Sequence, residues 1–244
     1  MISPIPNERA LYIKKEKAIV VADLHIGIEF EYHAQGINIP LQTSNMLEKI
    51  EFLIEEYRAD KIIIVGDLKH VISGAENKYF MEKERKEVNF FINRLSKNAD
   101  LIIVKGNHDV FLRSKKANIY NARGFKMGNI SFAHGHAWPS EEIMNGKIIV
   151  FAHLHPSLKI KNNHGYYLKP CWVRGKVNKN LKKYKKWNKK MNFVIMPFFN
   201  PLCGGSAINE EPEGVISKIA DIENSYVYLL DGTNLGIVKN LKKF

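Results

Sequence analysis

The chain has 244 residues, 45% of them hydrophobic and 25% charged, which is the composition of an ordinary globular protein. It contains no apolar stretch of about eighteen residues, which argues against a helical membrane span, and its first nine residues lack the pattern of a signal peptide. We therefore expect a cytoplasmic protein and, from its length, a single domain over residues 1–244.

The net charge of +12, from 37 basic and 25 acidic residues, favours polyanionic partners such as nucleic acid, phosphorylated small molecules or anionic lipid. A general enrichment in lysine without any specific partner would give the same charge. Cys171 and Cys203 lie far apart in the sequence and form no metal-type cluster, so we predict two buried thiols rather than a disulfide or a zinc site.

The first half of the chain alternates strand and helix patterns. In order, the expected elements are a hairpin at 11–22, a helix at 46–57, a strand at 61–65, a helix at 80–95 and a strand at 101–104. The strands are apolar throughout, as buried strands are, and the helices repeat apolar residues at helical spacing. Thr43 or Ser44 is expected to cap the first helix. This order predicts parallel strands with helical crossovers and ligands at their carboxyl ends.

The second half is rich in short strand patterns. A hairpin is expected at 125–133, around Gly128-Asn129, and a strand at 147–152. Further short strands are expected at 157–160, 166–168, 172–173, 193–199, 226–230 and 237–238. These predict a second sheet, antiparallel or mixed, packed on the first.

Residues 176–192 form a basic insertion with eight lysines and no acidic residue. Its apolar residues fall within one arc of a helical wheel: Leu181, Tyr184, Trp187 and Met191. One interpretation is a surface helix held by this stripe. The other is a basic arm or helix that follows a phosphate backbone, with Tyr184 or Trp187 stacking on bases. In either case the lysines face solvent.

Five short motifs follow the ends of the expected strands. They are Asp23-Leu-His25, Gly66-Asp67, Gly106-Asn107-His108-Asp109, His134-Gly-His136 and His153-Leu-His155. Together they offer carboxylates, an amide and several imidazoles, which is a ligand set for two divalent metals. Two such ions at close range are most often found in enzymes that hydrolyse phosphoesters.

The residue types within these motifs indicate their roles. Asp23 and His25 are two residues apart and can point at one ion, and their mix of oxygen and nitrogen suits Mn, Fe or Zn better than Ca or Mg. The two oxygens of Asp67 can bridge two ions. His108 is the predicted catalytic residue, as a general acid or a phosphate-stabilising group, with Asp109 accepting its Nδ1 proton.

Taken in order, the motifs resemble the calcineurin-like metallophosphoesterase superfamily over residues 18 to about 155. Segments such as Asp23-Leu-His-Ile-Gly27 and Pro197-Phe-Phe-Asn-Pro201 are similar to an archaeal subgroup related to SbcD-type nucleases and to bacterial DNA-ligase-associated phosphoesterases. The resemblance implies a four-layer α/β/β/α sandwich of two packed mixed sheets. Ala152 stands where the family usually has glycine, and we expect only a slight backbone adjustment there.

The same resemblance implies how the ligands divide. The first metal would be held by Asp23, His25 and His155, and the second by Asn107, His134 and His153, with Asp67 as the bridge. His108 would be the catalytic histidine, with Asp109 behind it. The expected cofactors are two divalent ions, Mn²⁺ first, with Fe, Zn or Ni as alternatives.

The leading hypothesis is a nuclease that acts on DNA or RNA in repair or processing, by attack of a metal-bridging hydroxide. The alternatives are a phosphatase or cyclic-nucleotide phosphodiesterase for small substrates, and a non-catalytic scaffold or nucleic-acid-binding subunit. The candidates for substrate contact are His136, His70, Lys69, Lys182, Lys183, Lys185 and Lys186. His136 could equally be a plain surface residue. Nucleic acid is the expected partner, no membrane is expected, and a homodimer and association with DNA-repair proteins are open alternatives.

Overall fold

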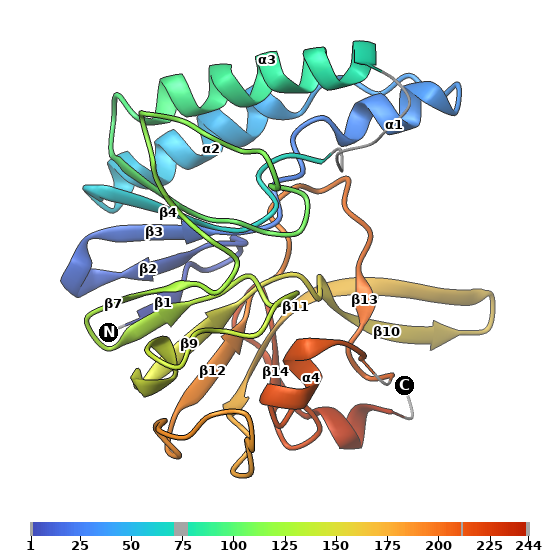
Figure 1. Cartoon of the computed structure of the whole chain (residues 1–244). Helices are drawn as coiled ribbons and strands as arrows, with labels where there is room; N and C mark the ends of the chain where they lie inside the picture. The colour runs from blue at the N-terminus through green and yellow to red at the C-terminus, as the bar shows by residue number, and fades with distance from the viewer. Residues whose placement is uncertain (1, 71–77, 211, 243–244) are drawn as a thin grey trace.

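The computed structural model describes residues 2–70, 78–210 and 212–242, which form two β-sheets packed face to face (Figure 1). The strands of the first sheet are, in spatial order, β1 (Ile2–Pro4), β2 (Leu11–Ile13), β3 (Ala18–Val21), β4 (Lys61–Val65), β5 (Asp100–Val104) and β6 (Asn118–Tyr120). The strands from β3 to β6 are parallel, while β1 and β2 are antiparallel additions.

The second sheet is mixed. Its main path is β13 (Ser206–Ala207), β10 (Pro156–Asn162), β11 (Gly165–Lys176), β12 (Asn192–Ile195), β9 (Ile148–Phe151), β8 (Ile130–Phe132) and β7 (Phe125–Met127). Two further strands, β14 (Tyr226–Leu229) and β15 (Asn234–Ile237), join it through β11. Because β8, β9 and β12 are parallel, their carboxyl ends lie at one edge of this sheet.

Three helices belong to the first half of the chain, and two of them cover the outer face of the first sheet (Figure 1). These two are α2 (Thr43–Glu56) and α3 (Lys78–Leu95), while α1 (Ile28–Ala34) follows β3. Side chains alternate along β4, so Ile62 and Ile64 pack under the helices whereas Ile63 and Val65 point at the second sheet. A strand buried on both faces must be apolar throughout, which is why the pattern was legible in the sequence.

The outer layer on the second sheet is thin. It consists of α4 (Val215–Ile219), two 3₁₀ helices (Ile143–Asn145 and Val238–Leu241) and the segment 177–191, and a third 3₁₀ helix, Lys14–Glu16, lies elsewhere, between β2 and β3. The predicted α/β architecture with two mixed sheets is therefore confirmed, with few helices in its fourth layer. No helix among the described residues is both long and apolar enough to cross a bilayer.

The surface-helix interpretation of the basic insertion is wrong. Residues 177–191 form turns and coil, although Leu181, Tyr184 and Met191 are buried as the apolar stripe required. Closely spaced lysines repel one another in a helix, and tertiary contacts hold the chain instead. The Tyr184 hydroxyl, for example, donates to the Pro139 carbonyl over 2.9 Å. A buried Tyr184 is not available for base stacking, whereas Trp187 is only partly buried and the lysines are exposed.

Two smaller expectations also need correction. Residues 166–168 and 172–173 were expected as two strands but belong to one, β11. The first half of β11 is exposed on both faces, so its sequence lacks the alternation of apolar and polar residues that marks a strand. Neither Thr43 nor Ser44 caps α2: the helix begins at Thr43, and the buried Glu29 carboxylate accepts a hydrogen bond from the Gln42 amide over 2.7 Å. The hairpins at 11–22 and 125–133 and the helices and strands from 43 to 104 are confirmed.

Candidate metal centre

The predicted metal ligands gather where the carboxyl edges of the two sheets meet. Asp23, Asp67 and Asn107 follow the parallel strands β3, β4 and β5. His134 and His153 follow β8 and β9, and His155 leads directly into β10. Side chains that are far apart in the chain meet here because parallel strands bring their carboxyl ends to the same edge.

Five of these ligands have an unusual backbone conformation. Asp23, His25, Asp67, His153 and His155 have φ angles of 53°, 41°, 49°, 66° and 45°. This left-handed region is uncommon for residues with a side chain and costs on the order of 1–3 kcal/mol each. Backbone bonds hold it, such as those from the Asp23 amide to the Gly66 carbonyl (3.1 Å) and from the His25 amide to the Asp67 carbonyl (2.9 Å). Such strain clusters at functional sites.

Asp67 is the centre of the cluster. One of its carboxylate oxygens lies 3.1 Å from Nε2 of His134 and 3.6 Å from Nε2 of His25, and the other accepts the His108 amide over 3.0 Å. Two groups of potential ligands share it: Asp23, His25 and Asp67 on one side, and Asp67, His134 and His153 on the other. Within each group the ligand atoms lie within 4.8 Å of one another. This division agrees with Asp67 as a bridge between two cations.

The charges in the site are tightly coupled. Burial alone would raise the pKa of Asp67, but the adjacent His134, His25 and the His108 amide hold that pKa well below its usual range. Burial likewise opposes charge on His134, yet Asp67 and Asp23 raise the His134 pKa to about 9. Burial lowers the pKa of His25 to about 3 and that of His153 to about 4. The last two imidazoles are therefore neutral at pH 7, the form that binds metals.

Divalent-metal affinity is expected to rise with pH up to about pH 9. Nε2 of His134 faces Asp67, and below its pKa of about 9 it holds a proton that a cation must displace. Each unit of acidification should therefore weaken binding at this position by up to about tenfold. Calorimetric titration with Mn²⁺ at pH 6.5, 7.5 and 8.5, in buffers of different ionisation enthalpy, measures both the affinity and the released proton. A pH-independent affinity without proton release would contradict the assignment of His134.

Backbone carbonyls select which imidazole nitrogen faces the site. Nδ1 of His134 donates to the Val65 carbonyl over 3.0 Å, and Nδ1 of His155 donates to the Gly204 carbonyl over 2.9 Å. With Nδ1 engaged, Nε2 of each ring points at a carboxylate: His134 at Asp67 and His155 at Asp23, over 3.6 Å. A fixed tautomer of this kind is typical of metal-ligating histidines.

His25 obtains its tautomer from two side chains that sequence reasoning did not place there. Nε2 of His70 lies 2.6 Å from a carboxylate oxygen of Glu31, and Nδ1 of His70 lies 3.3 Å from Nδ1 of His25. The carboxylate only accepts, so His70 donates through Nε2; when its ring is neutral, Nδ1 accepts and His25 donates. This leaves the buried Nε2 of His25 with a lone pair and no hydrogen-bond partner within the described residues.

His70 was predicted to bind substrate, but both of its ring nitrogens have protein partners. We therefore expect His70→Leu to weaken Mn²⁺ binding by about 10–100-fold, the usual cost of losing a group that orients a ligand. His70→Asn should restore much of the affinity, because an amide oxygen can accept the His25 proton. Calorimetry and the electron paramagnetic resonance spectrum of bound Mn²⁺ check this. Equal affinity in the wild type and the leucine variant would refute the orienting role.

The expected contact between His108 and Asp109 is not present in the structure. Asp109 is fully buried and accepts three backbone amides, those of Gly106 (2.9 Å), Lys69 (3.2 Å) and Leu68 (3.3 Å). It ties the loop after β4 to the loop after β5, so its oxygens are turned away from the imidazole. Nδ1 of His108 instead contacts the carbonyl oxygen of His70, and its Nε2 lies 4.0 Å from Asp67.

Gly106 is required by close approach rather than by its backbone angles. A Cβ at this position would lie 2.0 Å from a carboxylate oxygen of Asp67 and 2.5 Å from its amide nitrogen. Gly106→Ala is therefore expected to displace Asp67 and to abolish tight metal binding. Gly36→Ala is the matched control: it has open space but a φ of 81°, so it should lose about 1–3 kcal/mol of stability and keep the metals. Unchanged metal content in Gly106→Ala would contradict this geometry.

The loop after β12 is hydrogen-bonded to the segments that carry Asp23, His25 and His155. The buried Asn200 side chain donates to the Leu24 carbonyl over 2.8 Å, and the Phe199 amide donates to the Ala22 carbonyl over 2.8 Å. Together with the bond from His155 to Gly204, these contacts join the ends of β3 and β9. The Pro197-Phe-Phe-Asn-Pro201 segment was visible in the sequence, but the strands that it contacts could not be predicted from it.

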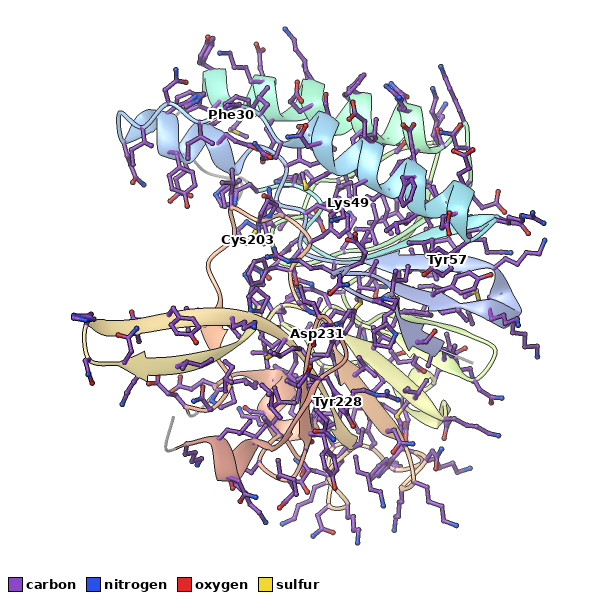
Figure 2. All side chains as sticks on the ribbon, turned by 180° about the vertical axis from the view of Figure 1, so that it is seen from behind. Phe30, Lys49, Tyr57, Cys203, Tyr228 and Asp231 are labelled. Carbon is purple, nitrogen blue, oxygen red and sulfur yellow. The ribbon has the colours of Figure 1, made fainter. Side chains whose placement is uncertain are left out.

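Both cysteines are free and buried, as predicted. Cys203, labelled in Figure 2, has its sulfur within 4.8 Å of ligand nitrogens of His25 and His155, and it packs with Ile28 and Phe198. Burial is the largest of the effects that raise the pKa of its thiol far above the usual value, so Cys203 is a neutral neighbour of the site. Ala152, the one departure from the family pattern, is buried between the sheets and leaves His153 in the cluster.

Of the remaining candidates for substrate contact, His136 lies beside the ligands. Its ring is 5.2 Å from that of His134, and its Nδ1 has no partner within the described residues. Lys69 lies 4.0 Å from Glu84. The predicted lysines Lys182, Lys183, Lys185 and Lys186 are exposed. Because β12 runs parallel to β9, the segment before β12 reaches the end of β9 opposite to His153. The Lys183 ammonium lies 5.2 Å from the Trp138 ring, two residues beyond His136.

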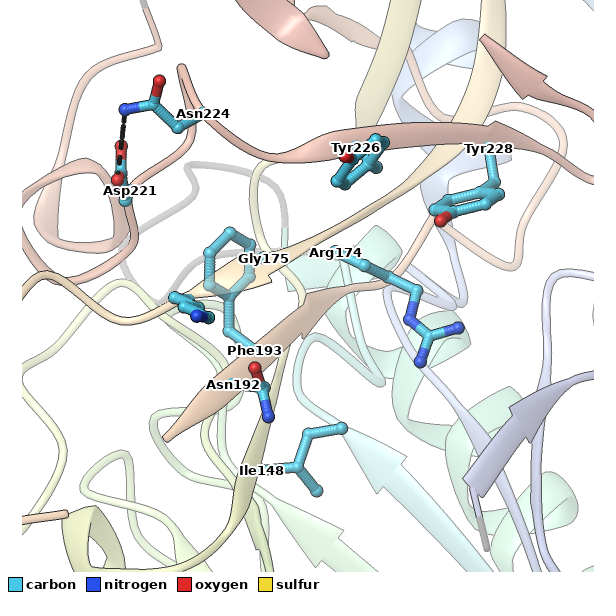
Figure 3. Close-up of a pocket in the computed structure, with 10 residues that line it drawn as sticks. Ile148, Arg174, Gly175, Asn192, Phe193, Asp221, Asn224, Tyr226 and Tyr228 are labelled. Atoms are coloured by element: carbon cyan, nitrogen blue, oxygen red, sulfur yellow. Dashed lines mark hydrogen bonds between the residues drawn. The ribbon is translucent and has the colours of Figure 1, made fainter. Parts of the chain in front are cut away.

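A separate cavity of about 560 Å³ lies on the second sheet (Figure 3). Arg174, Tyr226 and Tyr228 are among the residues that line it, and none of the predicted metal ligands does. It is therefore distinct from the metal centre.

The comparisons with known proteins agree with this fold. The family model for calcineurin-like phosphoesterases matches residues 17–206. The crystal structure of Pseudomonas putida nuclease MPE is similar with a TM-score of 0.59 at 20% identity, over 95% of this chain and 98% of that one. The DNA double-strand break repair protein Mre11 of Nanoarchaeum equitans is 32% identical over 92 residues, which is 36% of this chain and 22% of that protein.

Proposed function

The chain belongs to the calcineurin-like phosphoesterase family, and on that basis we propose that it is a phosphodiesterase that uses two divalent metals to cleave DNA or RNA. The observation that carries the proposal is Asp67, whose carboxylate is shared by two groups of potential ligands. The mixture of oxygen and nitrogen donors favours Mn²⁺, with Fe, Zn or Ni as alternatives.

The residues present fit a pair of cations. The buried Nε2 of His25 lacks a hydrogen-bond partner within the described residues, and Nε2 of His134 faces Asp67 directly. Asp23, His25 and His155 would hold one ion, Asn107, His134 and His153 the other, and Asp67 both. When bound, the ions would lower the pKa of a water and offset negative charge on the phosphate oxygens.

The chain's own groups would complete the reaction. His108 rests with its Nδ1 against the His70 carbonyl, which leaves Nε2 on the Asp67 side, 4.0 Å from the carboxylate. From there it would donate a proton to the leaving oxygen or a hydrogen bond to a non-bridging oxygen. Asp109 acts on this group only through the backbone, by fixing the two loops that carry Asp67 and His108.

Charge supports a polymer as the substrate. The net charge is +12, and the lysines between 176 and 192 are exposed, although the segment that carries them reaches the end of β9 opposite to His153. A small phosphoester needs no such extended basic surface, whereas a polynucleotide does. The names of the similar proteins, a nuclease and a DNA-repair protein, point the same way. We extend the proposal to a single-domain cytoplasmic enzyme that associates with DNA-repair proteins.

A panel of phosphoesters with added Mn²⁺ tests the proposal. It contains bis-p-nitrophenyl phosphate, p-nitrophenyl phosphate, 2′,3′-cyclic nucleotides and labelled single- and double-stranded DNA and RNA, with Asp67→Asn as the control. We expect polynucleotide cleavage that the variant lacks and that weakens steeply with salt. Turnover of the small substrates alone would replace the nuclease with a phosphatase or cyclic-nucleotide phosphodiesterase. No metal binding at all would leave a scaffold.

A further inference from the structure

The β10–β11 hairpin projects from the body of the molecule (Figures 1 and 2). Every residue from 161 to 169 is exposed, so neither face of the ribbon packs against the rest of the chain at this level. A two-stranded ribbon is marginally stable by itself, and its distal half contributes nothing to the core. An exposed extension of this kind needs an explanation outside folding.

The side chains on the hairpin are aromatic and basic. Tyr166 and Tyr167 are 62% and 49% exposed, which is unusual for residues of their size. Between Ser157 and Pro170 there are three lysines, one histidine and no acidic residue. Because consecutive residues point to opposite faces of a strand, each face presents one tyrosine.

Each tyrosine has a lysine on its own face. Lys161 is directly opposite Tyr166 in the antiparallel register, and Lys169 is two residues from Tyr167 along β11. Neither lysine has an ion-pair partner within the described residues, whereas Lys159 pairs with Glu210 and lies 4.4 Å from the Tyr166 ring. Tyrosines beside exposed lysines form a surface that binds bases and phosphates together.

The hairpin continues directly from the metal centre. β10 begins one residue after His155, and at about 3.3 Å per residue Lys159 and Lys161 lie about 13 and 20 Å further along the strand. At about 3.4 Å per stacked nucleotide, these distances correspond to about four and six nucleotides from a phosphate held at the ligands.

We propose that this hairpin binds the single-stranded nucleic acid whose phosphodiester enters the metal centre, with Tyr166 or Tyr167 stacking on bases and Lys161 and Lys169 contacting phosphates. This rests on the proposed function and specifies where the polymer runs. Single strands fit better than duplex, because a tyrosine can stack only on a base that is not already covered on both sides. A polyanion matches a hairpin whose own residues, 157–170, include no acidic side chain.

The test uses the full chain with Tyr166→Ala/Tyr167→Ala and, separately, Lys161→Ala/Lys169→Ala. Fluorescence anisotropy with a labelled twenty-nucleotide single strand, in EDTA, is compared with that of a trinucleotide, which is too short to reach the hairpin. Tyr226→Ala, an exposed tyrosine of β14 in the cavity of Figure 3, is the matched control. Turnover of bis-p-nitrophenyl phosphate with Mn²⁺ reports on the metal centre.

We expect the tyrosine variant to bind the long strand roughly five- to a hundredfold more weakly, the effect of losing about one base stack. The lysine variant should also show a smaller salt dependence. Both hairpin variants should turn over bis-p-nitrophenyl phosphate at the wild-type rate. The control Tyr226→Ala should bind the long strand as tightly as the wild type does.

The outcomes separate the two proposals. Wild-type-like binding of the long strand by both hairpin variants, in an enzyme that cleaves polynucleotide, overturns the hairpin inference and leaves the proposed function intact. A wild type that hydrolyses only small phosphoesters and binds no strand overturns both. A loss of dimerisation in the tyrosine variant, with unchanged strand binding, would assign the surface to a second copy of the chain instead.

Discussion

Asp67→Asn is expected to abolish metal-dependent turnover, by at least about 10³-fold, the upper range for loss of one electrostatic group at an active site. The amide has one oxygen and no charge, so it cannot serve both ligand groups that share Asp67. Turnover of bis-p-nitrophenyl phosphate and calorimetric titration with Mn²⁺ measure the effect, and we expect fewer than two ions to bind tightly.

The variant should remain folded, which separates loss of the site from loss of the protein. Without the carboxylate, the buried His134 loses its main anionic partner, but it can release its proton and keep its bond to the Val65 carbonyl. Circular dichroism and the melting temperature provide this check. Two tightly bound ions in Asp67→Asn would exclude Asp67 as the bridge.

His108→Ala is expected to retain both ions and to lose about 10²–10⁴-fold in turnover, the usual contribution of a general acid. Its Nε2 lies 4.0 Å from Asp67 and its ring packs edge-on against that of His25, with 4.8 Å between the ring centroids, but it belongs to neither of the two ligand groups that share Asp67. Full activity would refute the role.

The pH profile adds a signature that a merely structural role would lack. If His108 donates a proton, the fall in turnover at high pH should be present in the wild type and absent in the alanine variant. His33→Ala, a histidine of α1 bonded to the Ile39 carbonyl, is the control for removing an imidazole and should behave as the wild type. A descending limb that persists in His108→Ala would assign the proton to another group.

The fold was largely predictable because the burial of its central strands is visible in their apolar sequences. Residues 62–65 of the strand Lys61–Val65 are buried on both faces, so all four are apolar, and the helices that cover the strand repeat apolar residues at a period of 3.6. Where burial ends, this signal ends too. The distal half of β11 is solvated on both faces and was read as separate short strands. In the basic insertion, the apolar spacing suggested a helix, yet tertiary contacts satisfied it with coil.

The candidate metal ligands, and their meeting at one place, could be predicted without the structure. Each motif follows a strand directly, so the positions of Asp23, Asp67 and Asn107 depend only on local structure and on parallel pairing. The order of the motifs also indicated the family.

How those ligands are held could not be predicted and is seen only in the folded chain. Glu31 orients His70 across 39 residues, His70 orients His25 across 45, and Asn200 braces Leu24 across 176. Asp109, one residue from His108, turns instead to the amides of Leu68 and Lys69. The physical reason is that a hydrogen bond depends on directions set by the packing of two sheets and their loops, and no local pattern in the chain encodes those directions.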